Sequence, residues 1–358
     1  MLTLIPLTGV PEVQDGDDLV ALLLAAARGC GVALEDGDVL VVSSKVVSKS
    51  LGLWAQSSDR AAAVASQSVR VVAERMAGDR VTQIVQSVAG PVMAAGGVDA
   101  SNTGERDGVL LLPADPDAEA GRLREGVLAA TGLREVGVLL TDTAGRPWRF
   151  GQTDFALGAA GVEVVDDLRG GVDADGRPLA VTARAIGDEL AAAADLVKGK
   201  ADAIPAALVR GSGYASADGG SGGAAGGGPG AGPGAGVGAR QLIRVGREDW
   251  FDYGRAESVR AALGVEPGSA HARETGVASV GFEDTGTRLA RAIAVALHDA
   301  PTAGVDAGGE VVRVSAPSGY ELGVAVARLQ VALWGEGLTA SIPPEADSLE
   351  VTLQVRER

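Results

Sequence analysis

The strongest local signal in the sequence is the stretch VGVLLTDTAGRPWRFGQ, residues 136–152. Its first part, Val136 to Leu140, has the length and the branched apolar composition of a buried β-strand, and polar residues follow at once. We therefore expect the strand to end near Leu140. It would then deliver Asp142 and Thr143 to its carboxyl end, which is where open α/β sheets bind ligands.

Similar apolar runs alternate with helical segments over residues 1–210. Two of these runs have the pattern of buried strands, at 39–42 and 206–209. Helical patterns cover three further segments, 17–28, 117–131 and 184–197. Asp117 is a candidate N-cap of the second helix. This alternation predicts an α/β domain (α+β with a mixed sheet), although the strand order does not follow from the pattern.

A Gly/Pro/Ala-rich segment, residues 211–240, separates this domain from the rest of the chain. It contains GGSGGAAGGGPGAGPGAGVG, which has little side chain to bury, so we expect a flexible linker. Residues 241–358 after it form a second, smaller α/β domain. Its expected helices are 288–297 and 322–333, and its expected strands are 311–314 and 349–355.

Composition excludes several classes of protein. The 358 residues carry a net charge of -16 and no run of Lys or Arg, which argues against binding to nucleic acid or to an anionic membrane. The single Cys30 excludes an internal disulfide and a cysteine-based zinc site. The start MLTLIPLTGV lacks a signal-peptide pattern, and the apolar run 19–27 is too short to cross a bilayer. We therefore expect a cytoplasmic protein.

Polar residues after the first strand suggest a metal and phosphate site. A carboxylate beside a hydroxyl, as in Asp142 and Thr143, suits a hard cation such as Mg2+, and this ion commonly brings substrate phosphates with it. Arg146 and Arg149 would then contact phosphate or carboxylate oxygens. The alternative is an ordinary strand-to-turn connection, in which Asp142 caps the turn and both arginines lie on the surface.

Three other polar segments are weaker candidates. In the loop 96–102, Asp99 is a candidate metal ligand and Asn102 a candidate partner for a base or ribose, but an ordinary turn has the same composition. The segment 42–49 places two lysines beside hydroxyls after a strand, where lysines are also commonly just solvated. The segment 197–205 permits close approach of a ligand, although Gly199 also suits a helix C-cap. The two histidines lie after residue 240, so chemistry in the first domain would depend on metal and electrostatics.

Taken together and in this order, the segments of residues 3–211 resemble the coenzyme F420-0:L-glutamate ligase family. The matching stretches are IPLTGVPEVQDGDDL, EDGDVLVVSSKVVSKS, GVDASN, LLPADPDAEAGRLREG, VGVLLTDTAGRPWRFGQ and GRPLAVTARAIGDELAAAADLVKGKADAIPAALVRG. The resemblance implies a homodimeric, GTP-dependent amide ligase that requires Mg2+ or Mn2+, with two ions, and for which K+ is a further candidate ion. The expected reaction adds L-glutamate to the deazaflavin precursor F420-0 through an acyl phosphate and extends a gamma-linked tail.

The resemblance also assigns roles to residues of this chain. Asp99 and Asp142 would ligate one metal ion and Thr143 would contact a second. From the segment 141–152 itself, the candidate catalytic residues are Asp142, Arg146 and Arg149. The segments implied to bind GTP contain Val10, Pro11, Glu12, Val13, Ser44, Lys45, Lys49, Asn102, Lys198, Gly199, Lys200, Ala201, Asp202, Ala203 and Ile204. The chain departs from the family pattern at Ala95, Leu51 and Lys200, so we expect the first metal site to be more complete than the second.

The C-terminal segment 241–358 supports two interpretations. Related two-domain proteins carry a flavin-dependent, nitroreductase-like domain here, and LQVALWGEGLTASI at 329–342 resembles part of that fold. The segment is short and lacks an arginine-rich start, so a reduced or structural domain without FMN is the expectation. For the whole chain, the alternatives to the ligase are a non-catalytic GTP-binding protein and a GTP-dependent ligase for another carboxylated phosphoester.

Overall fold

A computed structural model of the chain describes residues 1–104, 106–217, 238–244, 253–279, 281–298, 303–308, 311–342 and 349–357. The chain divides into two compact units. Unit 1 contains residues 1–69 and 86–250, and unit 2 contains residues 70–85 and 251–358. A single cut in the sequence therefore does not separate the units, because a short segment from the first half of the chain packs with the last part.

Unit 1 is built on a five-stranded sheet with the order β1-β12-β2-β8-β9. The strands are β1 (Thr3–Pro6), β12 (Ala206–Arg210), β2 (Asp38–Ser43), β8 (Val136–Arg146) and β9 (Arg149–Ala160). β2 and β8 run parallel, and every other neighbouring pair in this sheet is antiparallel. The α/β class and the mixed sheet predicted from the sequence are thus confirmed, and all three predicted strand cores lie in this sheet.

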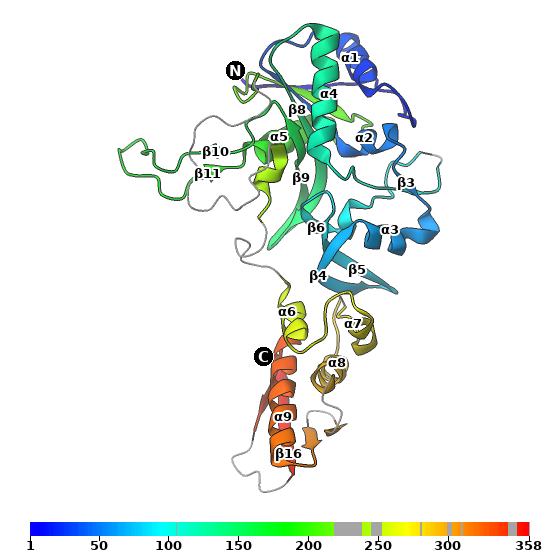
Figure 1. Cartoon of the computed structure of the whole chain (residues 1–358), viewed down its shortest axis with the longest axis vertical. Coiled ribbons are helices and arrows are strands. Elements are labelled where there is room, and N and C mark those ends of the chain that lie inside the picture. Colours follow the sequence, from blue (N-terminus) through cyan, green and yellow to red (C-terminus); the bar gives the residue numbers. More distant parts are fainter. Residues whose placement is uncertain are drawn as a thin grey trace. The chain divides into compact units, whose positions relative to one another are not determined.

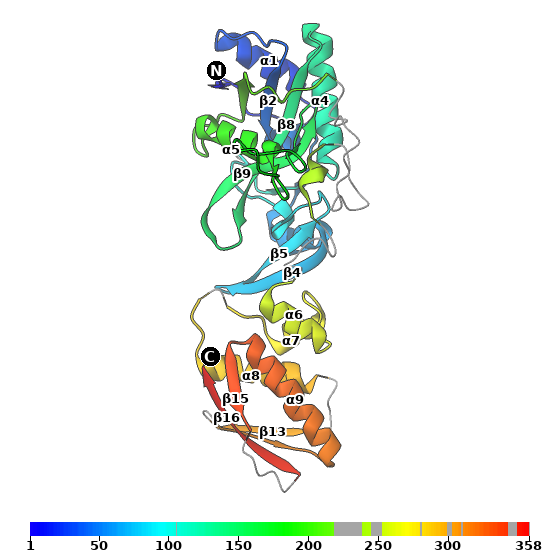
Figure 2. The ribbon, with the colours of Figure 1, turned by 90° about the vertical axis from the view of Figure 1, so that its left-hand side faces the viewer.

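Helices cover both faces of the sheet. One face packs against α1 (Leu19–Gly29), α2 (Ser44–Ser50) and α4 (Pro116–Thr131), and the other against α5 (Ile186–Lys198). Figure 2 shows the strands between α4 and α5. Along β2, Leu40 and Val42 belong to the first core and Val39 and Val41 to the second. Because successive side chains alternate between two buried faces, this strand reads as one continuous apolar run.

The predicted helices form, but one predicted cap is wrong. Helix α4 is capped by Asp115, whose carboxylate accepts from the N–H of Ala118, and Pro116 occupies its first turn. Asp117 instead accepts hydrogen bonds from the N–H groups of Ala159 and Ala239, each at 2.8 Å. It therefore ties the helix to the sheet and to a later segment. No helix among the described residues is long and apolar enough to span a membrane.

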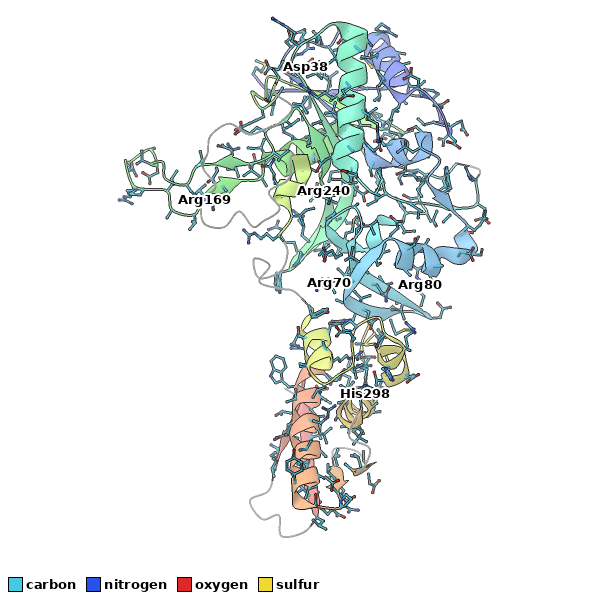
Figure 3. All side chains as sticks on the ribbon, in the orientation of Figure 1. Asp38, Arg70, Arg80, Arg169, Arg240 and His298 are labelled. Atoms are coloured by element: carbon cyan, nitrogen blue, oxygen red, sulfur yellow. The ribbon has the colours of Figure 1, made fainter. Side chains whose placement is uncertain are left out.

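The predicted linker, 211–240, lies mostly outside the described residues. Its described ends pack on unit 1. At the first end, Ala215 forms an isolated β-bridge with Val162. At the second end, Ala239 is buried within the 3-10 turn η3 (Gly238–Leu242). Arg240 in this turn is labelled in Figure 3.

The start of β2 is fixed by a buried carboxylate. Asp38, labelled in Figure 3, accepts two hydrogen bonds from the guanidinium of Arg210, at 2.9 and 2.8 Å. This bidentate pair joins the beginning of β2 to the end of the antiparallel β12. The register of the two strands is therefore set at one end, and their other ends lie beside the candidate site.

Shorter elements complete unit 1. They are β3 (Trp54–Ala55), η1 (Ser57–Asp59), α3 (Arg60–Ser66), β6 (Val92–Ala94), η2 (Ala95–Gly97), β7 (Val109–Leu110), β10 (Asp166–Asp167) and β11 (Ala183–Arg184). β3 pairs with β7, and β10 pairs with β11 in an arm on which Figure 3 labels Arg169. None of these short elements was predicted from the sequence.

Unit 2 combines a four-stranded antiparallel sheet with helices (Figure 1). The strand order is β13 (Gly304–Gly308), β14 (Val311–Ser315), β16 (Glu350–Glu357) and β15 (Leu338–Ser341), and the helices are α6 (Arg255–Ala262), α7 (Ala270–Thr275), α8 (Thr285–Leu297) and α9 (Gly319–Gly335). The predicted helices 288–297 and 322–333 and strands 311–314 and 349–355 are confirmed within α8, α9, β14 and β16, apart from Leu349, which precedes β16.

The hairpin of β4 (Ser68–Ala77) and β5 (Arg80–Ser87) contributes residues 70–85 to unit 2. Glu257 of α6 is buried; it forms an ion pair with Arg75 and accepts from the N–H of Glu74 at 3.1 Å. The carboxylate of Glu74 accepts in turn from the N–H of Gly268 at 3.0 Å. Polar groups of the hairpin are therefore satisfied by residues nearly two hundred positions later in the chain.

We expect Gly158→Ala to destabilise unit 1. A Cβ at this position in β9 would lie 2.3 Å from the carbonyl oxygen of Pro116, at the start of α4. Because that atom belongs to the backbone, the helix must shift, which costs about 1–3 kcal/mol of unfolding free energy. Gly145→Ala in β8 is the matched control, since its Cβ would meet no atom within 4 Å. Urea unfolding of both variants checks this, and equal midpoints would contradict it.

Candidate functional site

Strand β8 continues past the point at which its neighbour ends. The parallel pairing of β2 with β8 covers Asp38–Ser43 and Val136–Thr141, after which β2 turns directly into α2. β8 runs on to Arg146, paired with β9 alone. The predicted strand end near Leu140 is therefore wrong, because an antiparallel partner on the other side extends the strand. The backbone of Asp142 and Thr143 lies beside the space that β2 leaves.

A buried cluster lies on the α5 side of this extension. Asp154 of β9 stands opposite Thr143 and accepts from the hydroxyls of Thr143 and Thr141, at 2.7 and 2.9 Å. Lys198, the last residue of α5, donates to Asp154 at 2.7 Å and to Thr141 Oγ1 at 2.8 Å. Lys200 donates to Thr143 Oγ1 at 3.3 Å from a more exposed position. Thr143 is thus held by groups from β9 and from the loop after α5.

Asp154 and Lys198 form an ion pair in which each side chain is about 95% buried. Burial would raise the pKa of Asp154, but the Lys198 ammonium and the two threonine hydroxyls outweigh it and lower that pKa. Asp154 was missed in the sequence analysis. The available signal was an acid two positions past the segment 136–152 and just before the apolar run FALGAA.

A second cluster approaches from the α2 side. Lys45 in the first turn of α2 donates to Asp99 Oδ2 at 2.6 Å and to the carbonyl and hydroxyl of Ser101, both at 2.7 Å. Asp99 Oδ1 accepts from the N–H of Ser101 at 2.7 Å. Burial would raise the pKa of Asp99, but the hydrogen bonds from Lys45 and Ser101 outweigh it and lower that pKa.

The predicted nucleotide-binding turn, residues 10–13, joins the same cluster. Glu12 forms an ion pair with Lys49, whose side chain is almost completely buried in α2. A Cβ added to Gly104 would lie 3.5 Å from Glu12 Oε1, so the loop that follows Asp99 also approaches this turn. The structure therefore brings together three of the segments predicted to bind nucleotide: 10–13, 44–49 and 99–102.

Asp142 lies between the two clusters. Burial raises its pKa to about 6, and the nearby charge of Asp99 adds to the shift, whereas the N–H of Thr143 and the charge of Lys200 oppose it. The geometry thus places a carboxylate that resists ionisation next to two others, Asp99 and Asp154, that stay ionised. Such a site gains most from a bound cation, which would relieve both the burial and the repulsion.

Residues with a strained backbone conformation lie in or beside the predicted site segments. Among the described residues, four that are not glycine have positive φ: Ala95 (52°), Asn102 (55°), Trp148 (54°) and Ala203 (54°). Ala95 and Asn102 flank Asp99, Trp148 forms the β8–β9 turn, and Ala203 lies in the loop after α5. Non-glycine residues adopt this conformation rarely and at a cost, and such positions cluster at functional sites. Every one of the four lies next to or within a predicted site segment.

The loop after α5 is shaped by its first residue. Gly199 is the C-cap of the helix, as predicted, and its N–H donates to the carbonyl of Asp195. Its φ of 65° suits glycine, and a Cβ there would lie 2.1 Å from the Asp202 carboxylate. Asp202 is thereby folded back over the helix end. Of the remaining loop residues predicted to bind GTP, Ala201 is exposed and Ile204 is half-buried.

The two predicted catalytic arginines are not close to Asp142. Arg146 and Arg149 face each other across the β8–β9 turn, and both are exposed. Arg146 lies four positions after Asp142 in the extended strand, which corresponds to about 13 Å along the backbone. Their catalytic role stays a prediction, as it requires a substrate that extends toward the turn.

The residues at the centre fit a hard cation. Asp99 and Asp142 supply carboxylate oxygens and Thr143 a hydroxyl, which are the donors that Mg2+ or Mn2+ takes together with substrate phosphates. The raised pKa of Asp142 is the observation that favours this fit, since a cation beside it would lower that pKa. No group of three or more His, Cys, Asp or Glu side chains arranged to hold a metal occurs in the part of the chain described.

We expect Asp142→Asn to raise the stability of metal-free protein at neutral pH. The pKa of Asp142 is raised on folding, so stability is lost as pH rises from about 4 through 6, and the loss is constant above that range. One pKa unit corresponds to about 1.4 kcal/mol, and after allowing for partial exposure we expect a gain of about 1–3 kcal/mol at pH 7.5. Thermal unfolding with a chelator should show this gain, and it should vanish near pH 4. A variant less stable than the parent at pH 7.5 would refute it.

Comparisons with known proteins match the part of the chain that carries this site. The sequence model described as F420-0:Gamma-glutamyl ligase matches residues 9–211. A protein of Archaeoglobus fulgidus named coenzyme F420:L-glutamate ligase is 40% identical over 225 residues, which cover 59% of this chain and 88% of that protein. Proteins with the same name from Halobacterium salinarum and Haloarcula marismortui are each 39% identical, and the matches cover 87% and 84% of their lengths and 59% and 56% of this chain. The chain therefore belongs to the F420-0:gamma-glutamyl ligase family, a family of amide-forming ligases.

Proposed function

We propose that this chain ligates L-glutamate to coenzyme F420-0 in a reaction that consumes GTP and requires a divalent metal ion. The proposal includes an acyl-phosphate intermediate, extension of a gamma-linked glutamate tail, and a homodimer as the working form. Family membership and the names of the relatives support the acceptor and the glutamate. The requirement for GTP and metal is supported by the charges at the site.

The balance of charge around Asp142 carries the proposal. Four lysines lie there, Lys45, Lys49, Lys198 and Lys200, and three of them are paired with carboxylates. The carboxylates are Glu12, Asp99, Asp142 and Asp154. The four lysines therefore face at least as many carboxylates and leave no positive surplus to neutralise a triphosphate. Phosphoryl transfer between anions needs that neutralisation, so added cations are expected to arrive with the nucleotide.

The proposed reaction has two steps. In the first, a carboxylate oxygen of F420-0 attacks the γ-phosphorus of GTP, the bond to the β-phosphate oxygen breaks, and GDP leaves. In the second, the amine of glutamate attacks the acyl carbon, phosphate leaves, and the amine loses a proton to solvent or phosphate. The protein contributes positioning and electrostatic stabilisation, and no covalent bond to a side chain is needed.

Individual residues have distinct parts in this scheme. Lys200, the most accessible of the four lysines, would contact a phosphate oxygen next to Thr143. Lys45 and Lys198 keep Asp99 and Asp154 ionised and fixed. Divalent ions held by Asp99, Asp142 and Thr143 would neutralise phosphate charge, and K+ remains a further candidate ion. The exclusion of water would fall to the strained loops around Asn102 and Ala203.

We expect Asp142→Asn to lower turnover by at least about 100-fold. The variant loses a carboxylate ligand of the metal ion, and that ion would neutralise the charge of the phosphates in the transition state. Purified protein is incubated with F420-0, GTP, L-glutamate and Mn2+, and products are read by mass spectrometry. Products heavier by whole glutamyl units should form only when both GTP and the metal ion are present. Asp79→Asn, an exposed acid in the β4–β5 turn, is the control and should retain parental turnover.

Several results would count against the proposal. Extension of the tail without GTP, or in the presence of a chelator, would exclude metal-assisted phosphoryl transfer from the mechanism. Parental turnover in the Asp142→Asn variant would remove that residue from the metal site. A folded protein that binds GTP but makes no product would favour another carboxylated phosphoester as acceptor, or a non-catalytic role.

A further inference from the structure

A pocket of about 410 Å3 lies in unit 1 outside the cluster around Asp142. One wall is a single face of the segment η1–α3, formed by Asp59, Ala62 and Ser66. The opposite wall comes from β3 and from the loop that leads into β7, and includes Trp54 and Arg106. Its volume lies within the range of about 300–1,000 Å3 in which small-molecule sites usually fall. The mechanism proposed above makes no use of it.

The pocket has a flat aromatic wall. The guanidinium carbon of Arg106 lies 4.4 Å from the ring centroid of Trp54, so a planar group already stacks on the indole. Directly before β7, Gly108 has no side chain, and a Cβ there would lie 3.3 Å from Cε3 of Trp54. The indole is therefore in contact with backbone and with a movable guanidinium. A flat ligand could displace the guanidinium of Arg106 from the indole. The N–H groups of Arg106 would then remain at the rim as hydrogen-bond donors.

Polar groups at the rim suit a heterocycle with donors and acceptors. Gln56, Asp59 and Asp107 line the pocket together with Arg106. Asp107 accepts from the hydroxyl of Ser57 at 2.5 Å, which fixes its carboxylate at the edge of β3. Carboxylates and an amide can accept from ring N–H groups, and the guanidinium can donate to ring carbonyls. An apolar face with such a rim is the pattern of a site that orients an aromatic ring.

The pocket lies near the candidate site, because strand pairing joins a residue of its wall to Asp99. Trp54 pairs with Leu110, and Leu110 pairs on its other side with Asp99. Two neighbouring strand spacings separate the backbones of Trp54 and Asp99, about 10 Å in total. An elongated molecule with an aromatic ring at one end and a reactive carboxylate at the other could therefore occupy the pocket and reach the site at the same time.

We propose that this pocket binds the deazaflavin ring of the acceptor substrate, with the ring stacked on Trp54 and its edge hydrogen-bonded by the rim. The inference rests on the proposed function, which supplies the acceptor. Of the two flat rings in the reaction, the guanine of GTP fits less well. None of the residues predicted to bind GTP, Asn102 and the segment 198–204 included, lines this pocket.

The test fills the pocket without touching the core. Ala62 is exposed on α3 and lines the pocket, so Ala62→Leu should occlude it and leave folding intact. Ala65→Leu, on an exposed position of the same helix that does not line the pocket, is the matched control. We expect Ala62→Leu to raise the KM for F420-0 about 10-fold or more, with KM values for GTP and glutamate unchanged. The control should match the parent in all three.

A second variant and a binding measurement separate this inference from the proposed function. Trp54→Ala removes the stacking surface and should weaken binding of a deazaflavin that lacks the phosphoester and carboxylate by about 10- to 100-fold, measured by fluorescence anisotropy of the ring. This readout needs no turnover. If no glutamate is added but the ring still binds and Trp54→Ala weakens it, the inference stands and the proposed function fails.

Other outcomes would overturn the inference. If turnover is normal but Ala62→Leu and Trp54→Ala leave the KM for F420-0 unchanged, the ring binds elsewhere. If Ala62→Leu raises the KM for GTP instead, the pocket belongs to the guanine base. If the ring-only deazaflavin binds the parent and both variants equally, stacking on Trp54 is excluded.

Discussion

The candidate site depends on the length of one strand pairing. β2 pairs with β8 for six residues and then turns into α2, while β9 carries β8 on for five more. Where β2 stops, Asp142 and Thr143 lose a backbone neighbour, and side chains from α2, from the Asp99 loop and from the end of α5 converge on the space. A longer β2 would fill it with backbone. At the far end of β2, the bidentate pair of Asp38 and Arg210 ties the strand to β12.

Charges around this space are arranged in matched pairs except at the centre. Lys45 and Lys198 neutralise Asp99 and Asp154, and Lys49 is paired with Glu12. Asp142 has a raised pKa because it is buried and because the charges of Asp99 and Asp154 add to the effect of burial. Such an arrangement is costly in a protein selected for stability alone. It is expected where binding of a cation and a polyanion together restores the balance.

The sequence predicted the parts of the fold in which burial dominates. Strand cores such as 39–42 and 136–140 are apolar on both faces, so the runs were visible, and α1 and α5 formed within one or two residues of their expected ends. β9 was missed because it is an edge strand with glycines and polar residues. Asp154 was missed for a different reason. Its role depends on Lys198, 44 residues later, and no local spacing encodes that contact.

The match to the ligase family ends at residue 211, yet residues within that match belong to unit 2. In the β4–β5 hairpin, Glu74 and Arg75 find their partners at Gly268 and Glu257. A buried carboxylate such as Glu257 is stable only with its partners in place, so hairpin and helix α6 constrain each other. Sequence similarity marks one boundary in this chain, and hydrogen bonding marks another. The packing follows the hydrogen bonds. Residues 251–358 therefore form one unit with residues 70–85, which lie within the ligase match.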